Sequence, residues 1–212
     1  MATVIIDATP GNLHSAEKAF QKMASEVGAG AIVVTSDPET VAVADRIVLP
    51  GDGAFPAVMA ALTARPALVD ALHTAVITRA VPFFGICVGM QLLATLGEEF
   101  RETPGLDWVP GRVVPIDPGD ATLKVPHMGW NDLVIDAAHP VLNRVTTGDH
   151  AYFVHSYRME VTDPSHLIAH VDYGGPVTAI VGRDTMIGTQ FHPEKSQSAG
   201  LKMIANFLTW RP

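Results

Sequence analysis

Cysteine is almost absent from this sequence of 212 residues, which contains only Cys87. A single cysteine cannot form an internal disulfide, so a reducing cytosol is the simplest location. Basic residues are also in deficit, with 14 Lys and Arg against 22 Asp and Glu and a formal net charge of −8. Nucleic acids and anionic membranes attract clustered Lys and Arg, so the sequence predicts neither as a main partner.

Long uninterrupted apolar segments are missing too. The longest, residues 80–96, is interrupted by Pro82, Gly85 and Gly89, which is the pattern of a buried strand, turn and helix and not of a membrane span. The first seven residues have no basic segment ahead of their short apolar run, so no signal peptide is predicted. We therefore expect a soluble, cytoplasmic protein.

The first half of the chain alternates short β-branched runs with helical patterns. This order predicts a parallel sheet with helices on its faces. The expected strands are residues 4–7, 31–35, 46–49 and 81–86. Between them we expect a Pro10-Gly11 turn, a helix capped by Asn12 with the apolar face Leu13, Ala16, Phe20, Met23 and Val27, and a helical segment 57–80 broken at Pro66.

The second half contains short strand patterns separated by turn residues, without long helices between them. These strands are residues 112–116, 133–135, 151–157, 167–171, 177–181 and 186–191, and the chain closes with a helix whose face is Leu201, Ile204, Ala205 and Leu208. The prediction is an α/β fold with a mostly parallel central sheet flanked by helices, extended by antiparallel strands of the same sheet. Residues 1–212 are expected to form a single domain.

Cys87 lies at a junction between a predicted strand and a predicted helix, with Gly85 and Gly89 two residues to either side. This spacing is typical of a nucleophile elbow, in which a strained turn lifts the nucleophile out of the sheet and larger side chains at the flanking positions would collide with neighbouring backbone. The helix N-terminus favours a thiolate. The competing interpretation, a small buried hydrophobic residue, does not explain both glycines.

Gln91 follows Cys87 by four residues and therefore shares its face of the predicted helix. Its amide needs a hydrogen-bond partner if it is buried. That partner is either a neighbouring loop or a substrate held one turn behind the nucleophile.

A nucleophilic cysteine needs a base from elsewhere in the chain. His192 follows a predicted strand, and the extended backbone around Pro193 predicts that His192 and Glu194 lie on the same side. Glu194 then fixes the imidazole and stabilises its charged form. A metal site is not predicted, because His166 and His170 lie on a strand pattern with no further ligand nearby.

Acyl chemistry also needs donors for a developing oxyanion. The backbone N–H of Val88 is one candidate. The other is expected from the 50–53 loop, at the carboxyl end of a neighbouring parallel strand, with Gly53 as donor and Gly51 as a substrate contact. A plain glycine turn is the alternative for this loop, and no phosphate-binding motif accompanies it.

Taken together, these motifs resemble the class I (triad) glutamine amidotransferases. The resemblance rests on GICVGMQLL at residues 85–93 and GTQFHPEKS at residues 188–196. Within that class, PGNL at 10–13, PHMGWN at 126–131 and YFVHSY at 152–157 are similar to the glutaminase subunits of imidazole glycerol phosphate synthases. The resemblance covers nearly the whole chain.

The resemblance implies a mechanism and a partner. Cys87 attacks the side-chain amide of glutamine to form a thioester, His192 protonates the departing ammonia and activates water, and no cofactor is needed. Gln91 and the Ser156 and Tyr157 backbone hold the substrate. Ammonia passes to a (β/α)₈ cyclase subunit in a heterodimer that serves histidine biosynthesis. The family places at or near the interface the positions of Asn12, Trp130, Tyr152 and Lys195.

Asp52 departs from the family's usual pattern, in which this position is often apolar. A carboxylate beside a developing oxyanion is unfavourable, so we expect its side chain to face solvent or the partner. Two other functions remain open at this point: a glutaminase serving another synthase, such as those of anthranilate, guanylate or pyridoxal phosphate, and a non-catalytic scaffold that only binds a partner.

Overall fold

The computed structural model of the chain describes residues 1–8 and 13–212. The predicted Pro10-Gly11 turn and the helix cap and interface role assigned to Asn12 lie outside the described residues. The strands are β1 (Ala2–Ile6), β2 (Ala31–Thr35), β3 (Arg46–Gly51), β4 (Phe83–Cys87), β5 (Leu96–Gly97), β6 (Thr103–Pro104), β7 (Gly111–Pro115), β8 (His127–Asp132), β9 (Val134–Ile135), β10 (His150–His155), β11 (Tyr157–Val161), β12 (Leu167–Asp172), β13 (Pro176–Arg183) and β14 (Met186–Thr189). The helices are α1 (Leu13–Val27), α2 (Pro38–Ala42), α3 (Phe55–Thr63), α4 (Pro66–His73), α5 (Val88–Gln91) and α6 (Gln197–Thr209), with the short helical turns η1 (Thr74–Thr78), η2 (Pro140–Leu142), η3 (Pro164–His166) and η4 (Pro193–Lys195).

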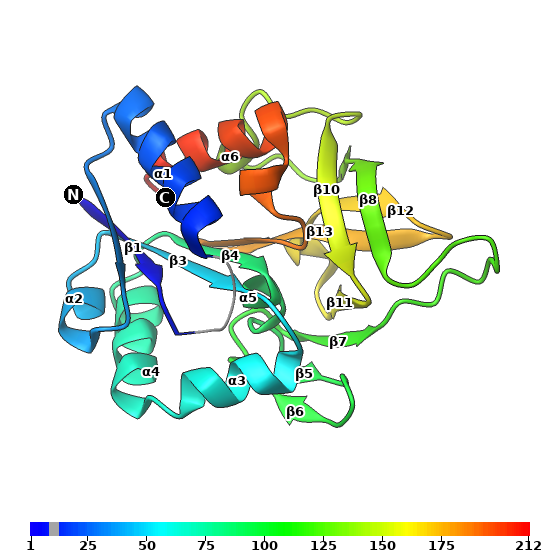
Figure 1. Cartoon of the computed structure of the whole chain (residues 1–212), viewed down its shortest axis with the longest axis horizontal. Coiled ribbons are helices and arrows are strands. Elements are labelled where there is room, and N and C mark those ends of the chain that lie inside the picture. Colours follow the sequence, from blue (N-terminus) through cyan, green and yellow to red (C-terminus); the bar gives the residue numbers. More distant parts are fainter. Residues whose placement is uncertain (9–12) are drawn as a thin grey trace.

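One sheet runs through the molecule in the order β2-β1-β3-β4-β14-β13-β12-β9. Its strands are parallel from β2 to β14 and antiparallel from there to β9. Helices α1 and α6 lie together over one face, and α3 and α4 lie on the other (Figure 1). The predicted α/β fold with a parallel centre and an antiparallel extension is therefore confirmed.

Two smaller sheets were not predicted as separate units. Strand β10 pairs with β8, and β11 belongs to a four-stranded sheet in the order β11-β7-β5-β6. The expected single strand 151–157 is therefore wrong: it divides at Ser156, because its two halves pair with different partners. Strand β8 was not predicted as a strand at all, since the PHMGWN string lacks a β-branched run.

The helical segment after β3 breaks at Pro66, as predicted. Pro66 occupies the first turn of α4, and the axes of α3 and the α4–η1 segment differ by 95°. Among the residues described, no single helix is long and apolar enough to cross a membrane; these two segments reach that length and composition only as a bent pair. Helix α2 was not predicted; it begins after Asp37, whose carboxylate accepts a hydrogen bond from Thr40 N and caps the helix.

The core joins the helices to the sheet through aromatic contacts. Phe20 of α1 packs edge-on against Phe84 of β4 and Phe207 of α6, with ring centroids 6.3 and 6.4 Å apart. The predicted apolar face of α1 is wrong at Val27, which is exposed. Leu201 and Ala205 of α6 are half-buried and pack against the core, and all three residues line a surface hollow between the two helices.

Candidate functional site

Cys87 ends β4 and adopts φ 55° and ψ −114°, a conformation that side chains rarely occupy. Its flanking glycines are required by close packing. A Cβ on Gly85 would lie 2.7 Å from the Gly89 carbonyl oxygen, and a Cβ on Gly89 would overlap the Leu49 carbonyl oxygen of β3. The predicted elbow, with small residues imposed by sterics, is confirmed as a structural feature.

The 50–53 loop lies beside this elbow, because β3 and β4 are parallel neighbours with Gly51 opposite Cys87. Gly51 packs tightly there: a Cβ would lie 2.7 Å from the Gly89 nitrogen. Gly53 has open space around it but adopts φ +104°, which favours glycine. The loop is therefore placed as predicted, while the oxyanion role of Gly53 and the substrate contact at Gly51 stay predictions.

His192 follows β14, the other neighbour of β4, and its Nδ1 lies 2.8 Å from Glu194 Oε1. Both side chains are buried. The expected contact is present, but the reasoning that led to it was partly wrong: Pro193 starts the helical turn η4, so the turn, and not an extended strand, brings Glu194 back to the ring.

The second nitrogen of His192 faces the nucleophile. Within ordinary distance limits His192 Nε2 has no hydrogen-bond partner among the described residues. Burial by itself lowers the pKa of His192, but interaction with the Cys87 sulfur and then with Glu194 outweighs burial and raises this pKa to about 10. A protonated imidazole is therefore held between a carboxylate and a sulfur, the arrangement that a thiolate nucleophile requires.

We expect the His192 ring to titrate near pH 10 in the intact protein and at lower pH in Cys87→Ala, because the sulfur is a main cause of the raised pKa. NMR of the imidazole resonances measures both midpoints. Folding raises this pKa from 6.5, so the protonated His192 ring stabilises the folded state. This contribution to the free energy of unfolding is complete below pH 6.5 and is lost as the pH rises through about 10. His155, whose pKa burial lowers to about 4, serves as the control, and an unchanged His192 midpoint in the variant would contradict the pairing.

Asp52 was expected to face solvent or the partner. Its side chain is 45% exposed, and its Oδ1 lies 3.9 Å from His192 Nε2, so the carboxylate is partly exposed and partly directed toward the site. The causes of the raised pKa of His192 are Cys87 and Glu194, and Asp52 lies beside this pair as one of the pocket's lining residues.

A pocket of about 320 Å³ opens over Cys87. Its lining includes five of the residues predicted to bind the substrate or the oxyanion, which are Gly53, Val88, Gln91, Ser156 and Tyr157. Gln91 is buried and its Nε2 donates to the Tyr157 carbonyl at 3.2 Å and to Gln190 Oε1 at 2.9 Å. Gln91 therefore bonds to neighbouring protein groups, one of the two alternatives that the sequence left open, and it also lines the pocket in which a substrate could reach it.

Sequence reasoning missed several lining residues, which are Glu99, Pro126, Val154 and His155. Glu99 comes from the loop after β5, where its Oε2 accepts a hydrogen bond from Phe55 N at 2.7 Å. No local pattern marks this carboxylate, because the fold of a long loop brings it to the pocket.

The three predicted interface residues that the structure describes, Trp130, Tyr152 and Lys195, lie on the β8–β10 ribbon and on η4. Trp130 is 48% exposed and packs edge-on against Tyr152, its cross-strand partner, with ring centroids 5.8 Å apart. Met128, on the same strand, is 62% exposed, and Lys195 is exposed on η4. The structure brings Trp130 and Tyr152 together, and their contact with a partner stays a prediction.

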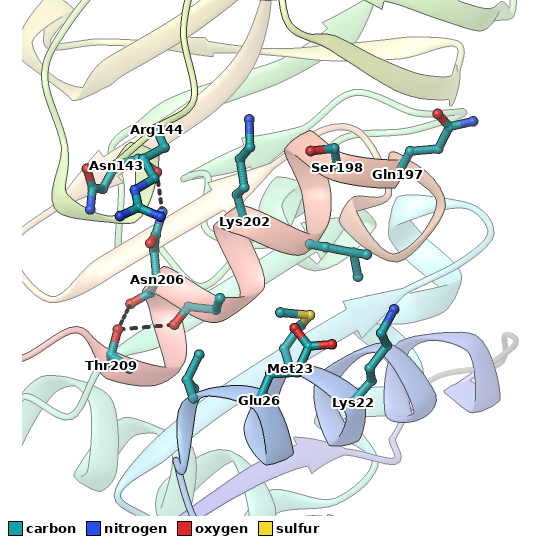
Figure 2. Close-up of a pocket in the computed structure, with 13 residues that line it drawn as sticks. Lys22, Met23, Glu26, Asn143, Arg144, Gln197, Ser198, Lys202, Asn206 and Thr209 are labelled. Atoms are coloured by element: carbon teal, nitrogen blue, oxygen red, sulfur yellow. Dashed lines mark hydrogen bonds between the residues drawn. The ribbon is translucent and has the colours of Figure 1, made fainter.

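A second hollow, of about 610 Å³, lies between α1 and α6 (Figure 2). Lys22 and Glu26 rise from α1 opposite Lys202 of α6, with Arg144 at one end. None of its 13 lining residues is a cysteine or histidine. Although this hollow is larger, the pocket at Cys87 contains the only cysteine of the chain, whose side chain interacts with His192, and it is the better candidate for chemistry.

No group of three or more His, Cys, Asp or Glu side chains among the described residues is arranged to hold a metal ion. His170, considered above with His166, instead has its Nδ1 2.8 Å from Asp136 Oδ2.

Comparison with known proteins decides the family. The model of the family described as "Glutamine amidotransferase class-I" matches residues 4–210. This chain belongs to the class I glutamine amidotransferases. Proteins named "Imidazole glycerol phosphate synthase subunit HisH" are 66% identical to this amidotransferase in Ruegeria pomeroyi and 63% identical in Cereibacter sphaeroides, each over 100% of both chains.

Solved structures share the fold of this amidotransferase. A crystal structure described as a glutamine amidotransferase superposes with a TM-score of 0.73 at 14% identity, covering 97% of this chain and 98% of the other. The glutaminase domain of a Trypanosoma brucei protein, solved with bound acivicin, gives a TM-score of 0.65 at 15% identity over 98% of this chain and 92% of that one.

Proposed function

We propose that this chain is the glutaminase subunit of an imidazole glycerol phosphate synthase, with residues 1–212 forming one amidotransferase domain. The observation that carries the proposal is the Cys87 elbow facing His192, whose other nitrogen Glu194 holds at 2.8 Å. The relatives named above support the assignment to this synthase through their identity over the full length. A continuous core with residues from both halves of the chain supports the single domain.

The proposed reaction begins when the Cys87 sulfur attacks the side-chain carbonyl carbon of glutamine. The C–N bond breaks, the protonated His192 gives its Nε2 proton to the departing nitrogen, and ammonia leaves behind a glutamyl thioester. His192 then takes a proton from water, which attacks the thioester. Glutamate leaves, and the thiolate and imidazolium are restored.

Several pocket groups fit glutamine in this reaction. The backbone N–H groups of Val88 and Gly53 are proposed to bind the oxyanion. Gln91, Ser156 and Tyr157 supply polar contacts along the pocket wall. The substrate also carries an α-ammonium group, and we assign it to Glu99, whose carboxylate is held in place at the pocket edge by Phe55 N.

The partner is proposed to be a (β/α)₈ cyclase subunit that receives the ammonia. Trp130, Tyr152 and Lys195 form the proposed contact face, together with Asn12. An exposed tryptophan packed on a half-buried tyrosine, beside an exposed methionine and a lysine, is typical of a surface that a partner covers.

The test is a glutaminase assay of the chain alone, with the cyclase, and with the cyclase and its acceptor substrate. We expect slow hydrolysis by the chain alone and faster hydrolysis when the loaded cyclase is present. Glutamate release and acceptor conversion are measured together. Full activity without the cyclase would contradict the coupling, and no hydrolysis under any of the three conditions would overturn the function.

Asp52→Asn is expected to raise the glutaminase activity of the isolated chain. The carboxylate pairs with His192 and places a negative charge near the proposed oxyanion site. Removing a half-exposed charge at this distance is worth about 1 kcal/mol, or roughly fivefold in kcat. Asp184→Asn, in the exposed turn between β13 and β14, makes the same charge change and should alter nothing. Lower activity in Asp52→Asn would indicate that the carboxylate helps catalysis.

A further inference from the structure

A chain of buried and partly buried hydrogen bonds runs along the inner side of the β8–β10 ribbon. His127 and His155 are cross-strand partners at one end of this ribbon, and His127 Nδ1 lies 3.0 Å from His155 Nε2. Both side chains are buried. Neither histidine takes part in the reaction described above, although His155 lines the pocket.

The partners of the two rings fix where their protons are. His155 Nδ1 lies 2.8 Å from the Tyr157 carbonyl oxygen, which can only accept, so Nδ1 carries the proton. Burial lowers the pKa of both histidines to about 4, so both rings are neutral at neutral pH. His155 Nε2 is therefore an acceptor, and His127 Nδ1 donates to it.

The same logic continues to Asn131. His127 Nε2 is left as an acceptor, and Asn131 Nδ2 lies 3.3 Å from it. The Asn131 amide is held in this orientation, because Nδ2 also donates to the Asp172 carbonyl at 3.0 Å and Oδ1 accepts from Asp132 N at 2.8 Å. The bonds thus run in one direction, from Asn131 through His127 and His155 to the Tyr157 carbonyl.

The Tyr157 carbonyl is where this chain meets the catalytic pocket. The same oxygen accepts the hydrogen bond from Gln91 Nε2, which also donates to Gln190 Oε1. Gln190 Nε2 in turn lies 3.8 Å from Cys87 Sγ. Polar contacts are therefore continuous from Asn131 to the nucleophile.

The opposite side of the same ribbon is exposed. Met128 and Trp130 alternate with His127 and Asn131 along β8, so their side chains emerge on the outer side. Strands β8 and β10 stand side by side at one end of the molecule (Figure 1). A movement of this short ribbon would move the hydrogen-bonded chain together with the exposed Met128 and Trp130.

We propose that His127 and His155 are positioning residues that hold the Tyr157 carbonyl and Gln91 in the geometry that binds glutamine, and that they connect this geometry to the exposed face of the ribbon. The proposal rests on the glutaminase function proposed above. Each ring contributes one directed donor, so a side chain that packs equally well without that donor should not replace it.

His127→Phe and His127→Asn separate the hydrogen bond from packing. The His127 ring stacks on Phe153 and Tyr173, with centroids 4.8 and 4.0 Å apart, and a phenyl ring preserves this stacking but donates nothing. An asparagine amide can still donate from near the Nδ1 position. Kinetic constants for glutamine are measured in the complex with the cyclase, alongside thermal stability, ammonia-dependent synthesis and the stimulation of glutaminase by the cyclase.

We expect His127→Phe to raise KM for glutamine about tenfold and to lower the stimulation by the cyclase, with ammonia-dependent synthesis unchanged. His127→Asn should recover most of both losses. The control is His139→Phe, which removes a half-buried histidine that lies outside this chain and the pocket and packs on Trp210. A purely structural role would give equal losses in His127→Phe and in a His139→Phe variant of equal thermal stability.

Unchanged KM and stimulation in His127→Phe would overturn the proposal, as would failure of asparagine to recover either. The wild-type complex distinguishes this outcome from failure of the proposed function. If wild-type protein hydrolyses glutamine and His127→Phe does so equally, only the positioning role is lost; if wild-type protein does not hydrolyse glutamine, the proposed function itself is wrong.

Discussion

Cys87→Ala is expected to abolish glutamine-dependent synthesis by the assembled synthase while leaving ammonia-dependent synthesis intact. The sulfur is the only group placed to form the thioester, and loss of a catalytic nucleophile costs on the order of 10⁶-fold in comparable triads. Free ammonia needs no thioester, so the cyclase should use it at the wild-type rate. The two rates are measured on the same complex with glutamine or an ammonium salt.

Cys87→Ser is the matched variant for this experiment, because it preserves size and replaces the sulfur with a much weaker nucleophile. We expect it to behave like Cys87→Ala in the glutamine assay, with both variants binding the cyclase normally. If both synthesis rates fell equally, Cys87 would be a structural residue of the complex and the proposed division of labour would be wrong.

His192→Asn should have the second largest effect, a loss on the order of 10³-fold in kcat for glutamine hydrolysis. An asparagine amide can still donate to Glu194, but it removes the nitrogen that faces Cys87. The departing nitrogen then lacks its proton donor, and the thiolate loses its cationic neighbour. Alkylation of Cys87 by a small neutral electrophile should slow in parallel, which is measured by mass spectrometry.

Glu194→Gln distinguishes the base from the residue that orients it. The glutamine amide oxygen can still accept from His192 Nδ1, but the carboxylate charge is gone, so the loss of kcat should be smaller than in His192→Asn.

Unchanged alkylation of Cys87 in His192→Asn would show that the imidazole does not influence the Cys87 sulfur, contrary to the pairing proposed here.

Much of this site could be predicted from short stretches of sequence. The glycines around Cys87 predict the elbow because larger side chains at these positions would collide with nearby backbone. His192 and Glu194 lie two residues apart, so their contact needs only one turn, although that turn is helical and not extended as expected. In both cases the decisive contacts are close along the chain.

Other features escaped the sequence because partners distant in the chain create them. Glu99 reaches the pocket through a loop with no motif, and the strand expected at 151–157 divides because its halves join different sheets. Asp52 lies 3.9 Å from His192, which is 140 residues away in the chain. None of these outcomes is encoded in a short window of residues.

The sequence by itself determined the α/β pattern, the elbow at Cys87, and the contact of His192 with Glu194, because each follows from local sterics or short spacing. The tertiary structure alone decided that these two segments meet, since β14 enters the sheet beside β4 only when the antiparallel half of the chain folds back. It also decided the Asn131–His127–His155 chain. Hydrogen bonds between buried side chains depend on which strands become neighbours, and that is a property of the whole fold.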